Sequence, residues 1–343
     1  MKKYTIPTGY LFTDVYSKGE LETLSIGDYG KQYNVKADFL GYHNEIAGVP
    51  NTHCMPLSEK WVITISTQYG CVMKCTFCDV PNVQWRGNAS FDDLKGQLYN
   101  AIGLFPECRY TERLNIHFAR MGEPIFNDAV FEFSRWAIAN KSQIASETGL
   151  RIEVLHPVLT TSSPRKFRQL EARLLEWCEI KNSLYNGQAG LQLSINSTSD
   201  EQRSKTYSDM QIYLADLGEI AKKLPPPVSR KYCLNFAYAT GNEVDADKLL
   251  AWGFSPDKFM CKITPIHNNN ACREHGISTV GGYDSYTPYA EPEDGLKRAG
   301  YDVLVFVPSL DEENGLVTCG NVVLGGSKLK YDEGLIKIEG LRR

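Results

Sequence analysis

The chain has no long hydrophobic run, no surplus of basic charge and no low-complexity tract. No stretch reaches the roughly 18 apolar residues of a membrane-spanning helix, so no membrane partner is expected. The opening MKKYTIPTGYLF contains no long apolar core and no small-residue cleavage site, which predicts no signal peptide and a cytoplasmic location. With 37 Lys and Arg against 41 Asp and Glu, the composition argues against a strongly basic nucleic-acid binder.

A disulfide framework is not expected either, because the cytoplasm keeps thiols reduced. Ten cysteines are nevertheless present, and three of them lie within the segment CVMKCTFC (71–78). Clustered thiols in such a chain indicate a metal site or catalysis. The isolated cysteines are interpreted as small buried hydrophobic residues, namely Cys108, Cys178, Cys233, Cys261 and Cys272.

Predicted strands and helices alternate between about residues 60 and 310, after a first stretch of short strands and turns. Strand patterns occupy 60–67, 113–124, 150–163, 189–199, 231–240, 258–266 and 301–310, and helical spacing occupies 88–105, 127–146, 165–180 and 211–224. Ser90 is predicted to cap the first of these helices. The alternation favours parallel strands with right-handed crossovers, in a barrel or part of one. In such folds reactive side chains lie at the C-terminal ends of the strands.

The three clustered cysteines, Cys71, Cys75 and Cys78, follow one of these strands. Tetrahedral zinc would require a fourth ligand. His53 or His117 could supply it, although no spacing points to either. Iron–sulfur cubanes are held by cysteine thiolates, normally four. Three thiolates would leave one iron open to bind a substrate or a cofactor.

The pattern Cys-x3-Cys-x2-Cys after a strand, with Phe77 before the last cysteine, resembles the radical S-adenosylmethionine (SAM) superfamily. The resemblance implies a four-iron, four-sulfur (4Fe-4S) cluster whose open iron binds SAM. It also implies an electron donor such as flavodoxin or ferredoxin, and cleavage of SAM to a 5′-deoxyadenosyl radical.

The segment MGEP (121–124) resembles the GEP motif of the same superfamily. The resemblance implies that Gly122 lets the backbone approach SAM and that Glu123 accepts a hydrogen bond from its ammonium group. The alternative interpretation is that Glu123 only caps a helix after a turn.

Five segments occur in the order found in the RlmN/Cfr family, and the chain is similar to that family over roughly residues 40–325. They are STQYGCVMKCTFC (66–78), MGEP (121–124), LTTSS (159–163), LQLSINSTSDEQRSK (191–205) and LVTCGNVVL (316–324). Members are radical SAM methyltransferases that act on adenosine in ribosomal or transfer RNA. The implied fold is α/β, a partial (β/α)6 barrel at 59–325 with a β-rich extension at 1–58 and a tail at 326–343.

The resemblance also implies roles for individual residues. Cys319 would receive a methyl group from a first SAM, and Glu45 would act as a base. A radical formed on that methyl group would then add to the adenine ring. The implied SAM contacts are Gly122, Glu123, Thr160, Ser162, Ser194, Asn196 and His267, with Ser163 replacing a family glycine.

Thr64 stands where the family has the cysteine that resolves the protein–RNA crosslink, and a hydroxyl cannot form the releasing disulfide. Cys54 is the alternative partner. The chain also lacks the family's helical RNA-binding module near its start. Two hypotheses follow: a divergent RNA adenosine methyltransferase, or a scaffold repurposed for radical chemistry on a small molecule, nucleotide or peptide. A binding module that merely contains a cluster is a third.

Overall fold

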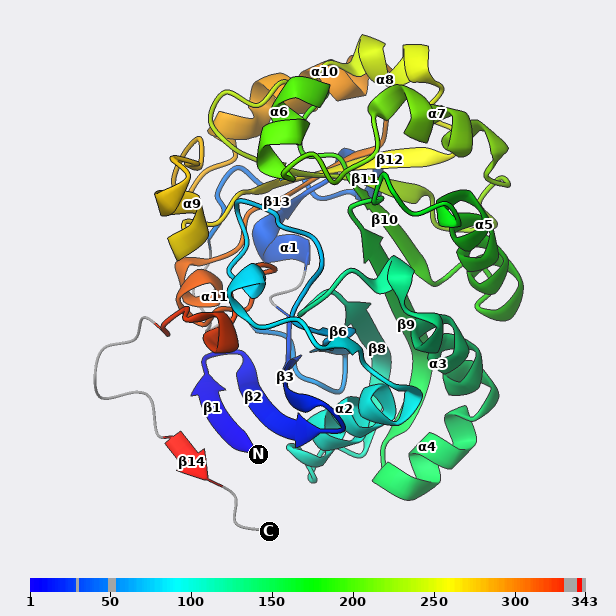
Figure 1. Cartoon of the computed structure of the whole chain (residues 1–343), viewed down its shortest axis with the longest axis vertical. Coiled ribbons are helices and arrows are strands. Elements are labelled where there is room, and N and C mark those ends of the chain that lie inside the picture. The colour runs from blue at the N-terminus through cyan, green and yellow to red at the C-terminus, as the bar shows by residue number, and fades with distance from the viewer. Residues whose placement is uncertain (29–30, 49–53, 330–337, 341–343) are drawn as a thin grey trace.

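The computed structural model describes residues 1–28, 31–48, 54–329 and 338–340, so His53 lies outside the described residues. Its described strands form one twelve-stranded sheet and a two-stranded ribbon, shown in Figure 1. The strands of the large sheet are β1 (Lys2–Ile6), β2 (Gly9–Tyr16), β3 (Gly19–Ile26), β4 (Val35–Lys36), β5 (Lys60–Thr64), β8 (Tyr110–Phe118), β9 (Arg151–Thr161), β10 (Gly190–Ser194), β11 (Tyr232–Tyr238), β12 (Phe259–Pro265), β13 (Val303–Phe306) and β14 (Ile338–Gly340). The ribbon consists of β6 (Gln68–Tyr69) and β7 (Gly87–Asn88).

The helices fill the connections between the strands, and Ser90 caps α2 through a reciprocal pair of hydrogen bonds with Asp93, which confirms the predicted cap. The predicted helix 127–146 is instead two helices, because the chain turns at Asn140 between them. The helices are α1 (Lys31–Asn34), α2 (Phe91–Gly103), α3 (Asp128–Ala139), α4 (Lys141–Thr148), α5 (Leu170–Glu179), α6 (Asp200–Thr206), α7 (Leu214–Lys223), α8 (Ala246–Trp252), α9 (Asn270–Glu274), α10 (Ala290–Arg298) and α11 (Leu310–Asn314). No helix in the described ranges is long and apolar enough to cross a bilayer.

Every neighbouring pair of strands from β5 through β13 is parallel, in the order β5-β8-β9-β10-β11-β12-β13. The described part of this run contains seven strands, one more than the six that the resemblance implied. The seventh, β13, falls within the strand pattern at 301–310. The sheet bends into an open arc with α3, α4, α5, α7 and α10 on its outer side (Figure 1).

Residues before β5 add antiparallel strands to both edges of the parallel run. The meander β1–β2–β3 joins the edge at β5, whereas β4 pairs with β13 at the opposite edge. This first part of the chain therefore continues the large sheet on both sides.

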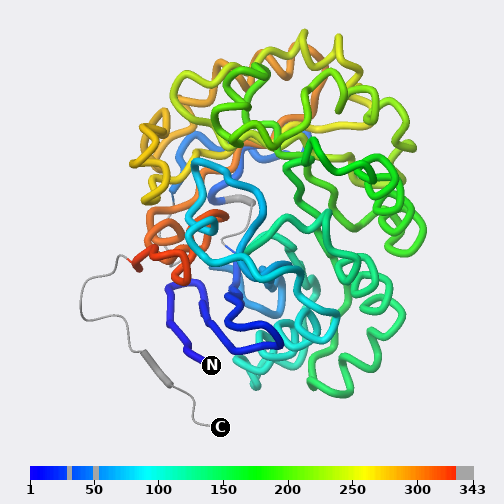
Figure 2. The backbone as a smooth tube through the Cα atoms, viewed as in Figure 1, coloured from blue at the N-terminus to red at the C-terminus, as the bar shows by residue number. Residues whose placement is uncertain are grey.

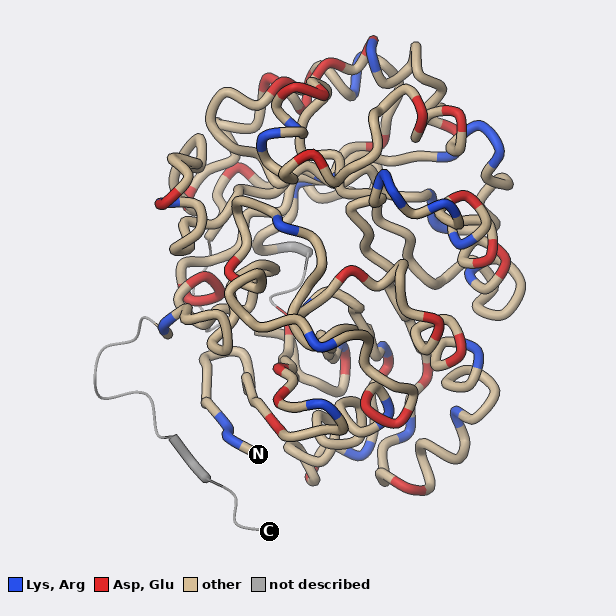
Figure 3. The backbone as a smooth tube through the Cα atoms, viewed as in Figure 1, with Lys and Arg blue, Asp and Glu red and all other residues tan. Residues whose placement is uncertain are grey.

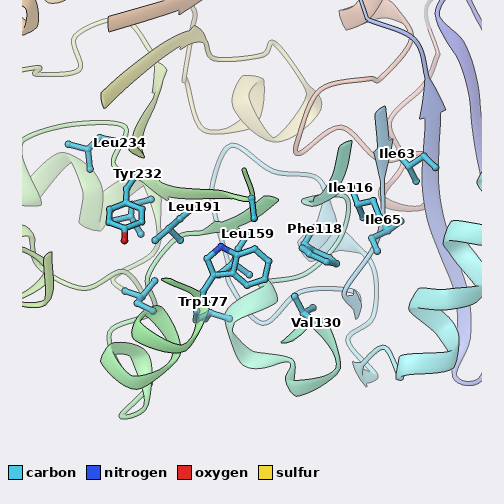
Figure 4. Close-up of a cluster of buried hydrophobic side chains, with 14 of the residues drawn as sticks. Ile63, Ile65, Ile116, Phe118, Val130, Leu159, Trp177, Leu191, Tyr232 and Leu234 are labelled. Atoms are coloured by element: carbon cyan, nitrogen blue, oxygen red, sulfur yellow. The ribbon is translucent and has the colours of Figure 1, made fainter. Parts of the chain in front are cut away.

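Alternation along the strands separates the two faces of the sheet. The outer face is apolar and packs against the helices, as Figure 4 shows for a cluster that includes Ile63, Ile116 and Leu191. Trp177 of α5 meets Phe118 edge-on at 6.1 Å between ring centroids. Since successive strand residues point to opposite faces, the polar residues between these apolar ones line the inner, concave face.

Candidate functional site

The three clustered cysteines lie in the loop between β6 and a short turn at Val80–Asn82. All three side chains are partly exposed. Burial raises the pKa of Cys71 to about 12 and raises the pKa values of Cys75 and Cys78 well above the usual range. The charges of Cys71 and Cys78 also raise the pKa of Cys75, and the charge of Cys71 raises the pKa of Cys78. Uncompensated thiols in such surroundings stay protonated, whereas bound metal ions would stabilise thiolates.

Cys319 joins this group from the far end of the described chain. Burial raises its pKa, Arg120 opposes that shift, and the charge of Cys319 in turn raises the pKa values of Cys71, Cys75 and Cys78. Its side chain is nevertheless exposed. The thiol is therefore reachable although protein atoms surround it.

Backbone contacts hold the Cys319 segment against the cysteine loop, as the light-blue and orange-red parts of Figure 2 show. Asp79 N donates to Gly320 O at 2.8 Å, and Asn269 Nδ2 donates to Phe77 O at 2.7 Å. Gly320 has a φ of 88°, in the left-handed region that side chains rarely adopt, and a Cβ there would lie 3.3 Å from Phe77 O. The contact therefore requires glycine after Cys319.

Glu123 is buried beside the cysteines, at the C-terminal end of β8. It accepts hydrogen bonds from Ser162 N at 2.8 Å and Ser162 Oγ at 2.6 Å. Burial raises its pKa, and the bonds from Ser162 act in the opposite direction. Glu123 also accepts a hydrogen bond from Ile125 N at 3.3 Å. This bond caps the short helical turn that follows, as in the alternative interpretation that Glu123 only caps a helix. A carboxylate has about four acceptor sites, and these bonds together with one from Thr161 occupy most of them.

The other predicted SAM contacts divide into two groups. Thr160 and Ser194 are partly exposed on the concave face of β9 and β10. Asn196 is instead occupied, because its Oδ1 accepts from Ala237 N at 3.0 Å. Ser163 has a φ of 57°, a conformation that favours the glycine which the resemblance places there.

The described contacts of His267 and Glu45 do not include the cysteines. His267 Nδ1 lies 3.4 Å from Glu313 Oε2, and its ring stacks on Tyr283 at 6.3 Å. Glu45 is exposed and makes no side-chain hydrogen bond or ion pair within the described part of the chain. The segment after Glu45 reaches the same region as His267, since Ala47 N donates to Asp284 O.

The two residues considered for resolving a crosslink lie in different surroundings. Thr64 ends β5 and pairs with His117 of β8. Cys54 lies against Gly27, and burial together with Asp28 and Glu312 raises its pKa to about 11. No described contact joins Cys54 to Cys319.

A mononuclear zinc site gains no support from this geometry. Among the described residues, no three Cys, His, Asp or Glu side chains are grouped closely enough to hold one metal ion. His117 has a pKa lowered to about 3 by burial and by Lys262, with no cysteine among the charges that act on it. A four-iron cluster is wider than a single ion and is compatible with more widely spaced thiols.

Sequence reasoning missed Arg120, which is buried directly before the MGEP segment. Its Nη1 donates to Leu316 O at 2.7 Å, and its Nε donates to Glu22 Oε1 at 2.9 Å. Glu22 of β3 also accepts from Leu324 N at 3.1 Å. Arg120 and Glu22 thus connect β3, the loop after β8 and the segment on both sides of Cys319. The sequence around Arg120 contains no pattern that predicts these partners, because they are distant along the chain.

The chain was compared with protein families, curated proteins and solved structures. No protein-family model matches the chain. The dual-specificity RNA methyltransferase RlmN 2 of Myxococcus xanthus is 27% identical over 199 residues, which cover 56% of this chain and 48% of that protein. The dual-specificity RNA methyltransferase RlmN of Halorhodospira halophila is 37% identical over 82 residues, covering 24% and 22% respectively. The match thus spans less than half the length of either relative.

The fold comparison agrees. A crystal structure of a radical SAM methyltransferase from Sphaerobacter thermophilus superposes with a TM-score of 0.59 at 16% identity, covering 91% of this chain and 76% of that one. At this identity the likeness concerns the fold. In sequence this chain is therefore similar to proteins named RlmN, and in fold it is similar to a radical SAM methyltransferase.

Proposed function

We propose that this chain is a radical SAM methyltransferase in which Cys71, Cys75 and Cys78 hold a 4Fe-4S cluster and Cys319 carries the methyl group. The convergence of Cys319 with the other three cysteines carries this proposal. An ordinary structural cysteine would not need to be both exposed and surrounded by three further thiols.

The residues present fit these cofactors. When bound, the cluster and SAM would supply the electron and the 5′-deoxyadenosyl radical that activate a methyl group. Glu123, oriented by its two bonds from Ser162, would accept from the SAM ammonium group, with Gly122, Thr160 and Ser194 beside it. Asn196 would shape this site through the backbone of β11, and His267 would border it.

The proposal places the chemistry in residues 59–325, with 1–58 and 326–343 as additions to that core. A cytoplasmic location would give access to an electron donor such as flavodoxin or ferredoxin. An RNA substrate is supported by the names of the curated relatives.

A second candidate function is radical chemistry on a small molecule without RNA methylation. The observation that favours it is Thr64 at the resolving position, together with the separate surroundings of Cys54. The three cysteines near Cys319 are the proposed cluster ligands, so among the described residues no free thiol is left beside it to release a crosslinked RNA through a disulfide.

The modification state of Cys319 tests the methyltransferase proposal. Protein expressed and purified without oxygen is digested, and the Cys319 peptide is examined by mass spectrometry with and without added SAM. We expect the mass of one added methyl group on Cys319 and none on Cys108, the partly exposed control. An unmodified Cys319 under both conditions contradicts the proposal and favours the second candidate.

A further inference from the structure

The concave face of the sheet carries cationic side chains from three of its parallel strands. Lys60 of β5 pairs with Arg113 of β8, and Lys262 lies on the inner side of β12 opposite Asn235. All three are partly exposed. Arg230, in the turn before β11, is exposed at the N-terminal end of these strands. A basic surface thus extends from that end into the arc.

Three of these cations have no carboxylate partner in the described chain. Arg113 Nη2 donates to Gln188 Oε1 at 3.3 Å, and Arg230 Nη1 lies 3.2 Å from the ring of His156. Lys262 Nζ lies 5.2 Å from the centroid of the Phe306 ring. Only Lys60 has an ion pair, with Asp28. Partly exposed cations without a carboxylate partner can bind an anion through charge-assisted hydrogen bonds, so this face favours a bound anion.

Burial lowers the pKa of Lys262, and Asp28, which pairs with Lys60, opposes that shift. The other nearby ionisable groups do not neutralise this charge. Burial raises the pKa of Glu312 to about 8, so that it is mostly protonated at neutral pH. Burial and Lys262 hold His117 neutral, and burial and Arg230 do the same for His156. Arg230 keeps its charge, because burial and Arg113 lower its pKa only to about 10.

The basic surface reaches the candidate active site. Lys262 of β12 lies in register with Asn235 of β11, which pairs with the predicted SAM contact Ser194 of β10. Arg113 precedes His117 by four residues, which is about 13 Å along a strand. An elongated ligand anchored near Arg113 and Arg230 could therefore extend toward Cys319.

We propose that Arg113, Arg230 and Lys262 bind the phosphate or carboxylate group of a small substrate on the concave face of the sheet. This inference rests on the proposed function for the reaction that follows binding. A small anion fits better than RNA, because Arg113 and Lys262 lie inside the arc. On the outer helices Lys and Arg are interspersed with Asp and Glu (Figure 3), and a polyanion needs many phosphate contacts on an accessible surface.

Calorimetry with the anaerobically reconstituted protein tests the inference, with inorganic phosphate, acetate and adenosine 5′-monophosphate as probes. We expect phosphate and the nucleotide to bind if the site accepts phosphate, and acetate to bind in their place if it accepts carboxylate. Arg230→Gln, Arg113→Gln and Lys262→Gln should each weaken binding about tenfold, since each removes a charged hydrogen-bond donor. Lys205→Gln, on exposed α6, is the matched control and should bind as the wild type does.

Two results would overturn the inference: no probe binds, or the three variants bind as tightly as the control. Binding of an RNA hairpin alone would also contradict it. Arg230 is exposed, so its variant should fold, and Lys262→Arg should retain binding by keeping the charge. These measurements need no SAM cleavage, so their failure leaves the methyltransferase proposal standing. Loss of the cluster or of Cys319 methylation would overturn that proposal alone.

Discussion

At the scale of single residues, Gly122 is a position near the candidate site where the backbone has no room for a side chain. Its φ is 97°, and a Cβ would lie 2.6 Å from the side chain of Gln68. Gly276 has a φ of 66° but open space around it, so Gly276→Ala is the matched control. We expect Gly122→Ala to lower the free energy of unfolding by more than Gly276→Ala, which should cost about 1 kcal/mol of backbone strain. Equal losses in chemical denaturation would show that Gln68 does not constrain this loop.

The raised pKa of Glu312 predicts a dependence of stability on pH. Its folded-state pKa of about 8 exceeds the ordinary value of 4.5 because the carboxyl group is buried. The folded state therefore holds a proton that the unfolded chain releases, and the free energy of unfolding falls as pH rises from 4.5 to about 8.

Glu312→Gln removes this titration. We expect the variant to be more stable than the wild type at pH 8, by on the order of a few kcal/mol, and to differ much less at pH 5. Thermal denaturation at the two pH values measures the difference, with Glu179→Gln on α5 as the exposed control. The same difference at both pH values would contradict the buried titration.

Glu45 remains a proposed base. Because its carboxylate is exposed and has no described side-chain partner, it is free to accept a proton from a bound substrate. We expect Glu45→Gln to slow turnover by about 100-fold or more while iron content and SAM binding stay unchanged. The exposed Glu59→Gln is the control. Normal turnover in Glu45→Gln would remove this residue from the mechanism.

At the scale of elements, the Arg120–Glu22 pair couples three parts of the chain that are distant in sequence. Both side chains are almost fully buried, and the arginine also binds Leu316 O. We expect Arg120→Met to lower the free energy of unfolding by about 3–5 kcal/mol, since it leaves Glu22 buried and unpaired. It should also speed alkylation of Cys319, because the backbone beside it is released.

The exposed pair between Lys205 and Glu201 provides the contrast for that prediction. Lys205→Met should change stability by less than about 1 kcal/mol, as exposed ion pairs usually do. Arg120 does not position the Cys319 segment if Arg120→Met also lowers the free energy of unfolding by less than about 1 kcal/mol and Cys319 is alkylated at the wild-type rate.

The strands and helices of the core were predictable from the sequence because their patterns are local. The alternation at 60–67 and 258–266 gave β5 and β12, and Ser90 marked the start of α2. The partners of Arg120 were not predictable, because they depend on how β3 and the segment around Cys319 meet. The same holds for Lys262, whose place on the concave face follows from strand register.

At the scale of the whole molecule, one curved sheet explains the arrangement of the candidate site. Helices cover its outer face (Figure 1). The cysteine loop and Glu123 follow the C-terminal ends of its strands, and Arg113 and Lys262 lie on its inner face. The first strands extend the edge at β5, which brings Glu22 to Arg120. Sequence segments at both ends of the described core therefore support Cys319.

The measurement that tests the central claim most directly is iron binding by the full chain reconstituted without oxygen. We expect about four irons per chain and an electron paramagnetic resonance signal that SAM perturbs. Cys75→Ala should lose both properties, whereas Cys108→Ala, the control outside the site, should keep them. A wild-type protein that takes up no iron and sulfide, or a Cys75→Ala variant with unchanged iron content and signal, would contradict the account.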